Sequence, residues 1–191
     1  MANNDLKGKR IGWIGTGRMG YAMAERLLKA GADLSAWNRT KSKAEPLAQL
    51  GATIVDNPSE LADRDIVFTM VGGPADFIEV TKGKNGVLAQ SGQVPGMLID
   101  CTSISEEASH EVREFATIVG TAMIDAPVSG NAKVVKAGKL SIVASGDKKA
   151  FEEALPFLDA IAQGVSYVGE GELARMVKIC HNVFLGVVIQ S

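Results

Sequence analysis

Short apolar runs alternate with segments of helical periodicity along most of the chain. Apolar runs rich in β-branched residues predict buried strands at residues 10–15, 33–37, 53–55, 65–71, 97–100, 121–125, 140–144 and 165–168. Apolar residues at three- and four-residue spacing predict helices at residues 18–30, 41–50, 74–81, 105–119 and 148–162, and a short helix opening at residues 57–59. This order is typical of an α/β fold with a doubly wound, mostly parallel sheet.

The last segment has a different pattern. Residues 172–191 form one long helical pattern, and residues 183–189 are apolar nearly all round. Such a helix needs partners on several sides, and seven apolar residues are too few to span a bilayer. We therefore assign residues 1–168 to the α/β domain and residues 169–191 to the start of a long helix that packs against something this chain lacks. The alternative is a natural short protein that buries the helix in an oligomer.

Composition excludes several classes of partner. The chain is 46% hydrophobic and 22% charged with a net charge of −2, which gives no electrostatic case for nucleic acid or an anionic membrane. No apolar segment has the length of a signal peptide or membrane span. Cys101 and Cys180 fit no metal or redox spacing. We expect reduced thiols, a cytoplasmic location, no metal site, and Cys180 in the core.

A G-x-G-x-x-G sequence follows the first predicted strand and opens the first helix. Gly15 permits a sharp turn, Gly17 permits close approach of the backbone to a pyrophosphate, and Gly20 lets the helix lie close to the strand. The helix N-terminus then offers free N–H groups to phosphates. We therefore expect a Rossmann-like dinucleotide site with contacts from Gly15, Thr16, Gly17, Arg18, Met19 and Gly20. The alternative is a tight glycine turn without a ligand.

Asn38, Arg39 and Thr40 end the second predicted strand, where the adenosine ribose of a dinucleotide should lie. Asn38 removes the carboxylate that would repel a 2′-phosphate, Arg39 supplies a fork-shaped cation, and Thr40 supplies a hydroxyl donor. The sequence thus favours NADP over NAD as the cofactor. The alternative is a solvated turn and helix cap.

Two later loops lie at strand ends, where doubly wound sheets bind ligands. Val71, Gly72 and Gly73 follow one buried strand, and Thr102 and Ser103 follow the next. We expect both loops to line the nicotinamide ribose, with Thr102 and Ser103 also near the substrate. A loop with a helix cap explains either one equally well.

A substrate site is predicted from two further segments. Ser129, Gly130 and Asn131 combine a hydroxyl, an amide and accessible main-chain N–H groups, which suits a carboxylate; the alternative is a polar turn. Lys178 and Asn182 share one face of the last helix. A lysine facing a closed pocket can have a lowered pKa and transfer a proton, whereas a surface lysine would extend along the helix into solvent.

Taken together, these motifs resemble the β-hydroxyacid dehydrogenase family, which includes 3-hydroxyisobutyrate dehydrogenase, tartronate semialdehyde reductase, the glyoxylate/succinic semialdehyde reductases and, more distantly, 6-phosphogluconate dehydrogenase. The resemblance rests on residues 12–20, on residues 125–130 with 137–140, and on residues 178–182. It implies hydride transfer between NADP(H) and a small β-hydroxy acid or semialdehyde. It also implies an all-helical domain after the last helix, and a homodimer or homotetramer.

The same resemblance implies roles for the site residues. The substrate carboxylate would rest on Ser129, Gly130 and Asn131, Lys178 would exchange a proton with the substrate oxygen, and Asn182 would orient the substrate or the lysine. The sequence departs from the family pattern at Asn131, Glu172, Ala174 and His181, which leaves the particular substrate open. Other functions stay open as well: an imine reductase, a 6-phosphogluconate dehydrogenase-like enzyme, or a non-catalytic NADP-binding sensor.

Overall fold

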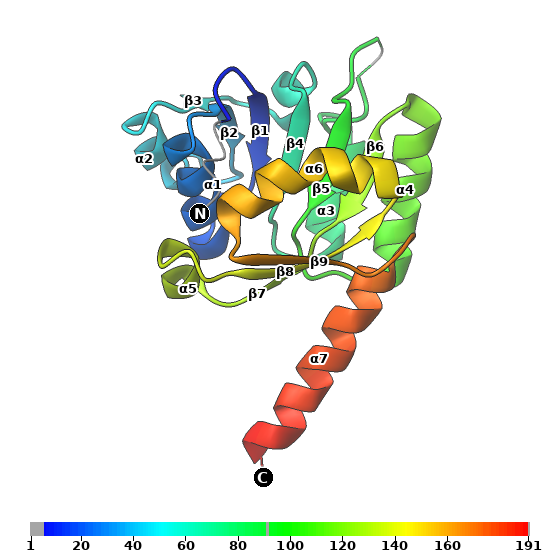
Figure 1. Ribbon diagram of the computed structural model, residues 1–191. Coiled ribbons are helices and arrows are strands. Elements are labelled where there is room, and N and C mark those ends of the chain that lie inside the picture. The colour runs from blue at the N-terminus through cyan, green and yellow to red at the C-terminus, as the bar shows by residue number, and fades with distance from the viewer. Residues whose placement is uncertain (1–5, 91, 191) are drawn as a thin grey trace.

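The computed structural model describes residues 6–90 and 92–190, and within them the strands form one mixed sheet (Figure 1). The strand order is β3-β2-β1-β4-β5-β6-β8-β7, with β9 also paired to β8. The first six strands in this order are parallel, and β8 is antiparallel to β6 and β7. The strands are β1 (Arg10–Ile14), β2 (Asp33–Trp37), β3 (Thr53–Ile54), β4 (Ile66–Thr69), β5 (Met97–Asp100), β6 (Ala122–Asp125), β7 (Val128–Ser129), β8 (Ser141–Gly146) and β9 (Gly164–Tyr167).

Helices cover both faces of the sheet, which confirms the doubly wound α/β fold. The helices are α1 (Arg18–Lys29), α2 (Glu45–Ala48), α3 (Pro74–Lys82), α4 (Glu106–Val119), α5 (Ala132–Lys136), α6 (Lys148–Ile161) and α7 (Leu173–Gln190), with 3-10 turns η1 (Lys41–Lys43) and η2 (Pro58–Leu61). One buried cluster joins α1 and α6 to the sheet, and a second joins α3 and α4 to it. In Figure 1, α6 crosses the front of the sheet.

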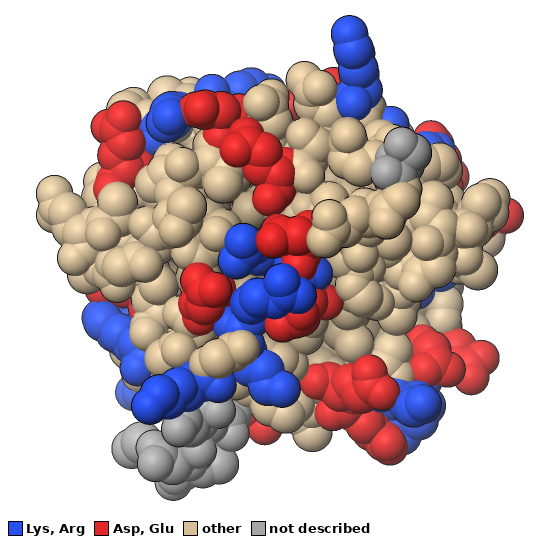
Figure 2. Space-filling model, turned by 90° about the horizontal axis from the view of Figure 1, so that it is seen from above, with Lys and Arg blue, Asp and Glu red and all other residues tan. Residues whose placement is uncertain are grey.

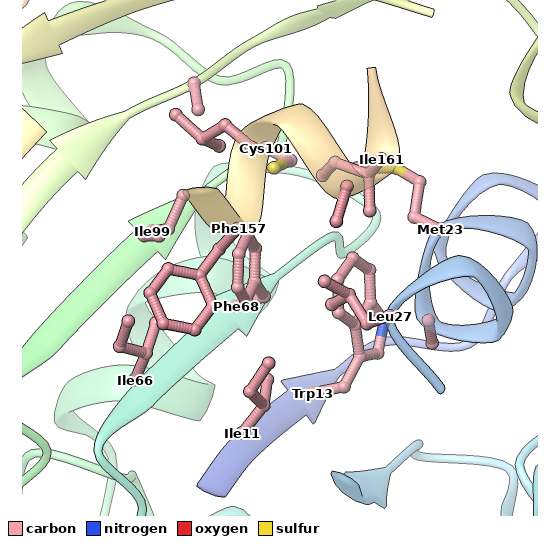
Figure 3. Packing of buried hydrophobic residues seen from close by; sticks show 14 of the residues in the cluster. Ile11, Trp13, Met23, Leu27, Ile66, Phe68, Ile99, Cys101, Phe157 and Ile161 are labelled. Carbon is pink, nitrogen blue, oxygen red and sulfur yellow. The ribbon is translucent and has the colours of Figure 1, made fainter. Parts of the chain in front are cut away.

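Aromatic packing fills the core beneath α6 (Figure 3). Trp13 on β1 and Phe68 on β4 stack with their ring centroids 5.2 Å apart, and both are fully buried. Phe157 and Ile161 of α6 belong to the same cluster. These contacts fix β1 and β4 side by side, so that the loops after them open at the same edge of the sheet.

One local prediction was wrong, and two short elements were not predicted. Residues 41–50 are not one helix: η1 and the short α2 divide the segment, and Pro46 lies at the start of α2, where it has no N–H to continue a helix from η1. The segment between β6 and β8, where the sequence analysis assigned no helix or strand, contains β7 and α5. The side-chain oxygen of Asn131 caps α5 by accepting hydrogen bonds from Lys133 and Val134 N–H, at 3.0 and 3.1 Å.

Helix α7 projects away from the body of the protein at the edge where the parallel strands end (Figure 1). Several of its large apolar side chains are exposed: Leu173, Met176, Val177, Ile179, Val183, Phe184, Leu185, Val187 and Val188. Across the described part of the chain, no helix combines the length and hydrophobicity needed to cross a membrane.

The face of the molecule on the side away from α7 carries charged side chains of both signs. Figure 2 looks onto the molecule from above and shows Lys and Arg side chains lying beside Asp and Glu side chains. Near the start of β1, Arg10 pairs with Asp65 at 2.6 Å, and Arg64 pairs with Asp63 at 2.9 Å. Because the signs alternate, the face shown presents no extended basic surface for a polyanion.

Candidate dinucleotide cleft and active site

The turn between β1 and α1 is built around its three glycines. Gly15 has φ +97°, a backbone conformation that L side chains rarely adopt, and a Cβ there would overlap the carbonyl oxygen of Met70. A Cβ on Gly20 would overlap the carbonyl oxygen of Gly15. Of the residues that the structure describes, apart from its two chain neighbours, none places a heavy atom within 4 Å of a Cβ built on Gly17. Gly15 and Gly20 therefore close the turn, while Gly17 borders open space.

Backbone N–H groups at this turn are available to a ligand. Gly17 is the N-cap of α1, and no side chain caps the helix, so its first N–H groups are free for an anion. The hydroxyl oxygen of Thr16 is buried and has no hydrogen-bond partner among residues 6–90 and 92–190. Thr16 N–H donates to Asn38 Oδ1 at 2.8 Å, which ties the turn to the end of β2.

A cleft of about 450 Å³ opens in front of this turn. It is lined by Gly15, Gly17, Arg18, Met19, Gly20, Trp37, Asn38, Arg39, Thr40, Lys43, Met70, Val71, Gly72, Asp76, Glu79 and Val80. The open backbone at Gly17, the uncapped helix and the cationic side chains fit the phosphates of a dinucleotide. Most of the cofactor contacts expected from the sequence lie together here; Thr16, Gly73, Thr102 and Ser103 do not line this cleft.

Sequence reasoning missed the acidic side of the cleft. Asp76 on α3 pairs with Arg39, with 2.8 Å between Arg39 Nη1 and Asp76 Oδ1. Glu79 lines the same wall. The position of Asp76, a few residues after the Val71–Gly72–Gly73 loop, could have suggested that it lies near the cofactor site. Only the fold shows that α3 faces the end of β2.

Thr102 is buried, and its polar groups are used inside the protein. Val71 N–H donates to its hydroxyl oxygen at 3.1 Å, and its own N–H donates to Asp100 Oδ1 at 3.1 Å. Ser103, next in the chain, is exposed. Thr102 thus joins the loops after β4 and β5. Of the two residues Thr102 and Ser103, Ser103 is the one exposed to solvent.

The predicted proton donor meets the predicted substrate cradle. Lys178 Nζ on α7 donates a hydrogen bond to Ser129 Oγ on β7, at 3.0 Å. Lys178 is half-buried, and burial lowers the pKa of its ammonium. Gly130 and Asn131 are exposed beside Ser129, although the Asn131 side-chain oxygen is already used to cap α5. Asn182, one turn further along α7, is exposed.

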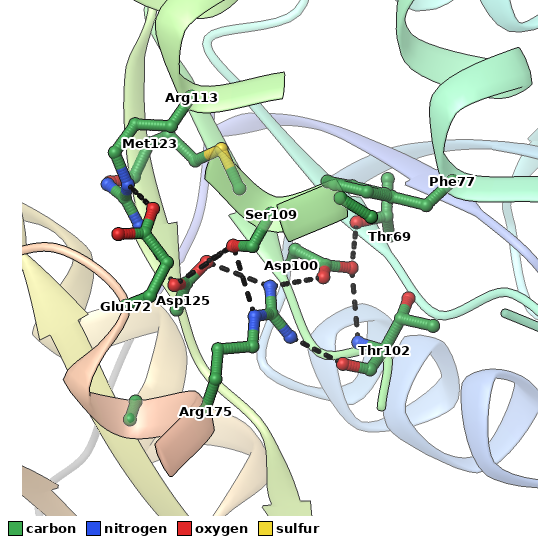
Figure 4. A network of polar contacts seen from close by, with 12 residues as sticks. Thr69, Phe77, Asp100, Thr102, Ser109, Arg113, Met123, Asp125, Glu172 and Arg175 are labelled. Atoms are coloured by element: carbon green, nitrogen blue, oxygen red, sulfur yellow. Dashed lines mark hydrogen bonds and ion pairs between the residues drawn. The ribbon is translucent and has the colours of Figure 1, made fainter. Parts of the chain in front are cut away.

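A buried guanidinium anchors the first turn of α7 (Figure 4). Arg175 Nη2 lies 2.6 Å from Asp100 Oδ2 and 2.8 Å from Asp125 Oδ1, at the ends of β5 and β6. Its Nη1 donates to the carbonyl oxygen of Thr102 at 2.6 Å, and its Nε donates to Ser109 Oγ at 3.1 Å. These contacts place Lys178, three residues later, next to β7.

The network extends to a second ion pair. Arg113 on α4 lies 2.7 Å from Glu172 Oε1 and 2.9 Å from Asp125 Oδ2. Burial raises the pKa of the Asp125 carboxyl, although Arg175 and Arg113 oppose the shift. Burial lowers the pKa of the Arg175 guanidinium, but the two facing aspartates outweigh it and keep the group charged. Arg175 was not assigned a role from the sequence, because its partners are far away in the chain.

The two cysteines have opposite environments. Cys101 is buried, and burial raises the pKa of its thiol. Cys180 is exposed on α7, so the expectation that it lies in the core was wrong. Among the described residues, no group of His, Cys, Asp and Glu side chains is arranged to hold a metal ion.

Comparison with known proteins identifies the class. Residues 10–169 match the family described as the NAD binding domain of 6-phosphogluconate dehydrogenase. The chain belongs to this family of NAD(P)-binding domains. Its similarity to proteins named glyoxylate/succinic semialdehyde reductase and 3-hydroxyisobutyrate dehydrogenase places it in the β-hydroxyacid dehydrogenase family, where it corresponds to the N-terminal domain.

Three similar proteins illustrate the relationship. The chain is 36% identical over 182 residues to glyoxylate/succinic semialdehyde reductase 2, chloroplastic, of Arabidopsis thaliana, covering 95% of this chain and 51% of that protein. The structure of Mycobacterium tuberculosis 3-hydroxyisobutyrate dehydrogenase with L-serine is 27% identical with a TM-score of 0.85, covering 94% of this chain and 61% of that one. An imine reductase from Myxococcus stipitatus in complex with NADP+ is 25% identical with a TM-score of 0.82, covering 95% and 63%. The chain spans about half the length of the Arabidopsis reductase.

Proposed function

We propose that this protein takes part in NADP(H)-dependent hydride transfer to and from a small β-hydroxy acid or semialdehyde. The observation that carries the proposal is the hydrogen bond between Lys178 Nζ and Ser129 Oγ, since these two residues are the expected proton donor and part of the expected carboxylate site. The printed names of similar proteins, glyoxylate/succinic semialdehyde reductase and 3-hydroxyisobutyrate dehydrogenase, support this class of substrate.

The cofactor would be held by the β1–α1 turn and the end of β2. Free N–H groups at the start of α1 would bind the pyrophosphate, and Arg39 and Thr40 would bind a 2′-phosphate. Asn38 is fixed by its bond to Thr16 N–H and puts no negative charge at this position. These residues favour NADP(H) over NAD(H). When bound, the nicotinamide supplies or accepts a hydride.

The chain's own residues would bind the substrate and move its proton. Ser129 Oγ and the backbone at Gly130 would hold the substrate carboxylate. Lys178 Nζ would give a proton to the substrate oxygen during reduction and take it back during oxidation. The lowered pKa of Lys178 helps this exchange, because an amine whose pKa lies nearer to the working pH releases and accepts its proton more readily. Asn182 would orient the substrate or the lysine.

Two measurements test this function. Calorimetric titration of the 191-residue chain with NADP+ and NAD+ should show tighter binding of NADP+. In any longer protein that carries this sequence, a panel of small aldehyde acids is tested for oxidation of NADPH. Lys178→Ala should lower the turnover number roughly 10²–10⁴-fold. The dissociation constant for NADP+ should stay within twofold of the wild-type value. The exposed Lys149→Ala, on α6 and outside the motifs of the site, is the matched control and should leave turnover unchanged. An unchanged turnover in Lys178→Ala would remove Lys178 from the reaction.

An imine reductase is the second candidate, because a structure of that class with NADP+ has a closely similar fold. Its substrates would carry a C=N bond and need no carboxylate. Turnover of cyclic imines without turnover of aldehyde acids would favour it. Binding of NADP+ with neither activity would favour a sensor.

Location and assembly also belong to the proposal. We propose a cytoplasmic protein, because both cysteines are free thiols, and a homodimer or homotetramer. Light scattering on the purified protein measures the assembly directly.

A further inference from the structure

An ion pair lies in the lining of the candidate dinucleotide cleft. Arg39 follows β2 and Asp76 lies in the first turn of α3, yet Nη1 and Oδ1 are 2.8 Å apart, and both residues line the cleft. The Arg39 side chain is 79% exposed and that of Asp76 is 37% exposed. The cation expected to take the cofactor's 2′-phosphate therefore already has an anionic partner.

The fold holds the Asp76 carboxylate at this position. An acidic side chain in the first turn of α3 interacts favourably with the helix dipole. A Cβ on Gly72 would lie 2.6 Å from Asp76 Oδ2, so the glycine leaves room for the carboxylate. Glu79, the other acid on this wall, points elsewhere: a Cβ on Gly83 would lie 2.6 Å from its Oε1. Of these two acids, Asp76 is the one that meets Arg39.

We propose that Asp76 sets the cofactor preference by competing with a 2′-phosphate for Arg39, and so limits the advantage of NADP(H) over NAD(H). A guanidinium binds carboxylate and phosphate through the same pairs of N–H groups, so one partner displaces the other. A 2′-phosphate on Arg39 would also lie close to the Asp76 carboxylate and be repelled by it. The 2′-hydroxyl of NAD(H) carries no charge and meets neither penalty. The inference rests on the proposed binding of a dinucleotide in this cleft.

The test is the ratio of two dissociation constants in the 191-residue chain. Calorimetric titration gives Kd for NAD+ and for NADP+ in wild type and in Asp76→Asn, which keeps the side-chain size and removes the charge. We expect the NAD+/NADP+ ratio of Kd values to rise about five- to tenfold, through tighter binding of NADP+. Thermal unfolding checks that the variant is folded. A ratio that stays the same or falls would overturn the proposal, since a fall would mean that Asp76 holds Arg39 ready for the phosphate.

Asp56→Asn is the matched control. Asp56 pairs with Lys41 at 2.5 Å near the same end of β2, but neither residue lines the cleft. This variant makes the same change in charge and should alter the ratio by less than twofold. An equal rise in Asp56→Asn would assign the effect to overall charge and contradict the specific role of Asp76.

A fragment experiment separates the two proposals. The compound 2′,5′-ADP carries the 2′-phosphate without the nicotinamide, and 5′-AMP lacks that phosphate. Asp76→Asn should lower the dissociation constant for 2′,5′-ADP and should change that for 5′-AMP by less than twofold. If wild type binds both dinucleotides and Asp76→Asn changes no ratio, the inference alone fails; if wild type binds neither, the proposed function and the inference fail together.

Discussion

Lys178 Nζ and Ser129 Oγ are joined by a hydrogen bond of 3.0 Å although the two residues are 49 positions apart. The contact connects α7, the helix that leaves the domain, with β7 at the edge of the sheet. It holds a half-buried lysine at the place where the sequence predicts a bound carboxylate. The first prediction follows from this contact.

Lys178 should react with acetic anhydride at lower pH than an ordinary exposed lysine, whose pKa is about 10.4. Burial lowers the pKa of its ammonium, and only the neutral amine reacts. Trace labelling between pH 7 and about pH 12, read by mass spectrometry, gives the midpoint, with exposed Lys139 in the same digest as the reference for the reagent. Ser129→Ala removes a hydrogen-bond acceptor for the ammonium and should lower the midpoint further. A midpoint at or above 10.4 would contradict this assignment.

Arg175→Met should cost about 3–5 kcal/mol of unfolding free energy near pH 7, because it leaves Asp100 and Asp125 buried without their shared cation. Loss of Arg175 removes a contact that lowers the pKa of Asp125, so that folded-state pKa rises further above its unfolded value of about 3.8. The loss of unfolding free energy is therefore greatest at pH values above the pKa of Asp125 in the folded variant. It becomes smaller as the pH falls towards about 4 and the carboxyl group takes up a proton. Urea unfolding of wild type and variant at several pH values measures the difference.

Two controls support this second prediction. Arg10→Met removes an exposed cation from Asp65 and should cost only a small fraction as much. Adding Asp100→Asn to Arg175→Met removes the carboxylate whose ion pair was with Arg175, whereas Asp125 keeps Arg113, and should recover part of the lost stability. A penalty for Arg175→Met that does not vary with pH would show that lost packing, and not the carboxylates, dominates.

Gly17→Ala and Gly20→Ala should separate ligand binding from folding at the same turn. A methyl group on Gly20 overlaps the carbonyl oxygen of Gly15, so Gly20→Ala should destabilise the domain by about 3 kcal/mol. A methyl group on Gly17 meets open space, so Gly17→Ala should cost about 1 kcal/mol at most. That methyl occupies the space where the pyrophosphate would lie, and dinucleotide binding should weaken at least tenfold. Denaturant unfolding measures the change in stability, and calorimetric titration measures the change in dinucleotide affinity. If Gly20→Ala were as stable as wild type, the close contact between the helix and the strand would be contradicted.

Native protein should expose one reactive thiol. Cys180 is exposed, whereas Cys101 is buried and its thiol has a raised pKa. Titration with an aromatic disulfide at pH 8 should give one equivalent in native protein and two in denaturant. Cys180→Ser should reduce the native value to zero. Fast reaction of two thiols in folded protein would show that Cys101 becomes accessible without unfolding.

Much of the fold was predictable because hydrophobic periodicity reports burial directly. The runs that became β1, β4 and β5 are apolar and buried over residues 11–14, 66–68 and 97–99, as expected for strands covered on both sides, and a buried polar residue ends β4 and β5. The short elements β7 and α5 were missed because two and five residues are too few to show a period. The break between η1 and α2 was overlooked although Pro46 signals it.

For the cleft, the sequence alone determined the glycine turn, since its spacing and its place between a strand and a helix are local properties. The tertiary structure decided which distant groups meet: Asp76 with Arg39, Lys178 with Ser129, and Arg175 with two aspartates. Those pairs depend on strand order and on how α3 and α7 pack at the ends of the parallel strands. A local sequence pattern carries no information on such packing. The same charged and polar residues, at the same positions in the sequence, could equally well lie on an exposed surface without meeting each other.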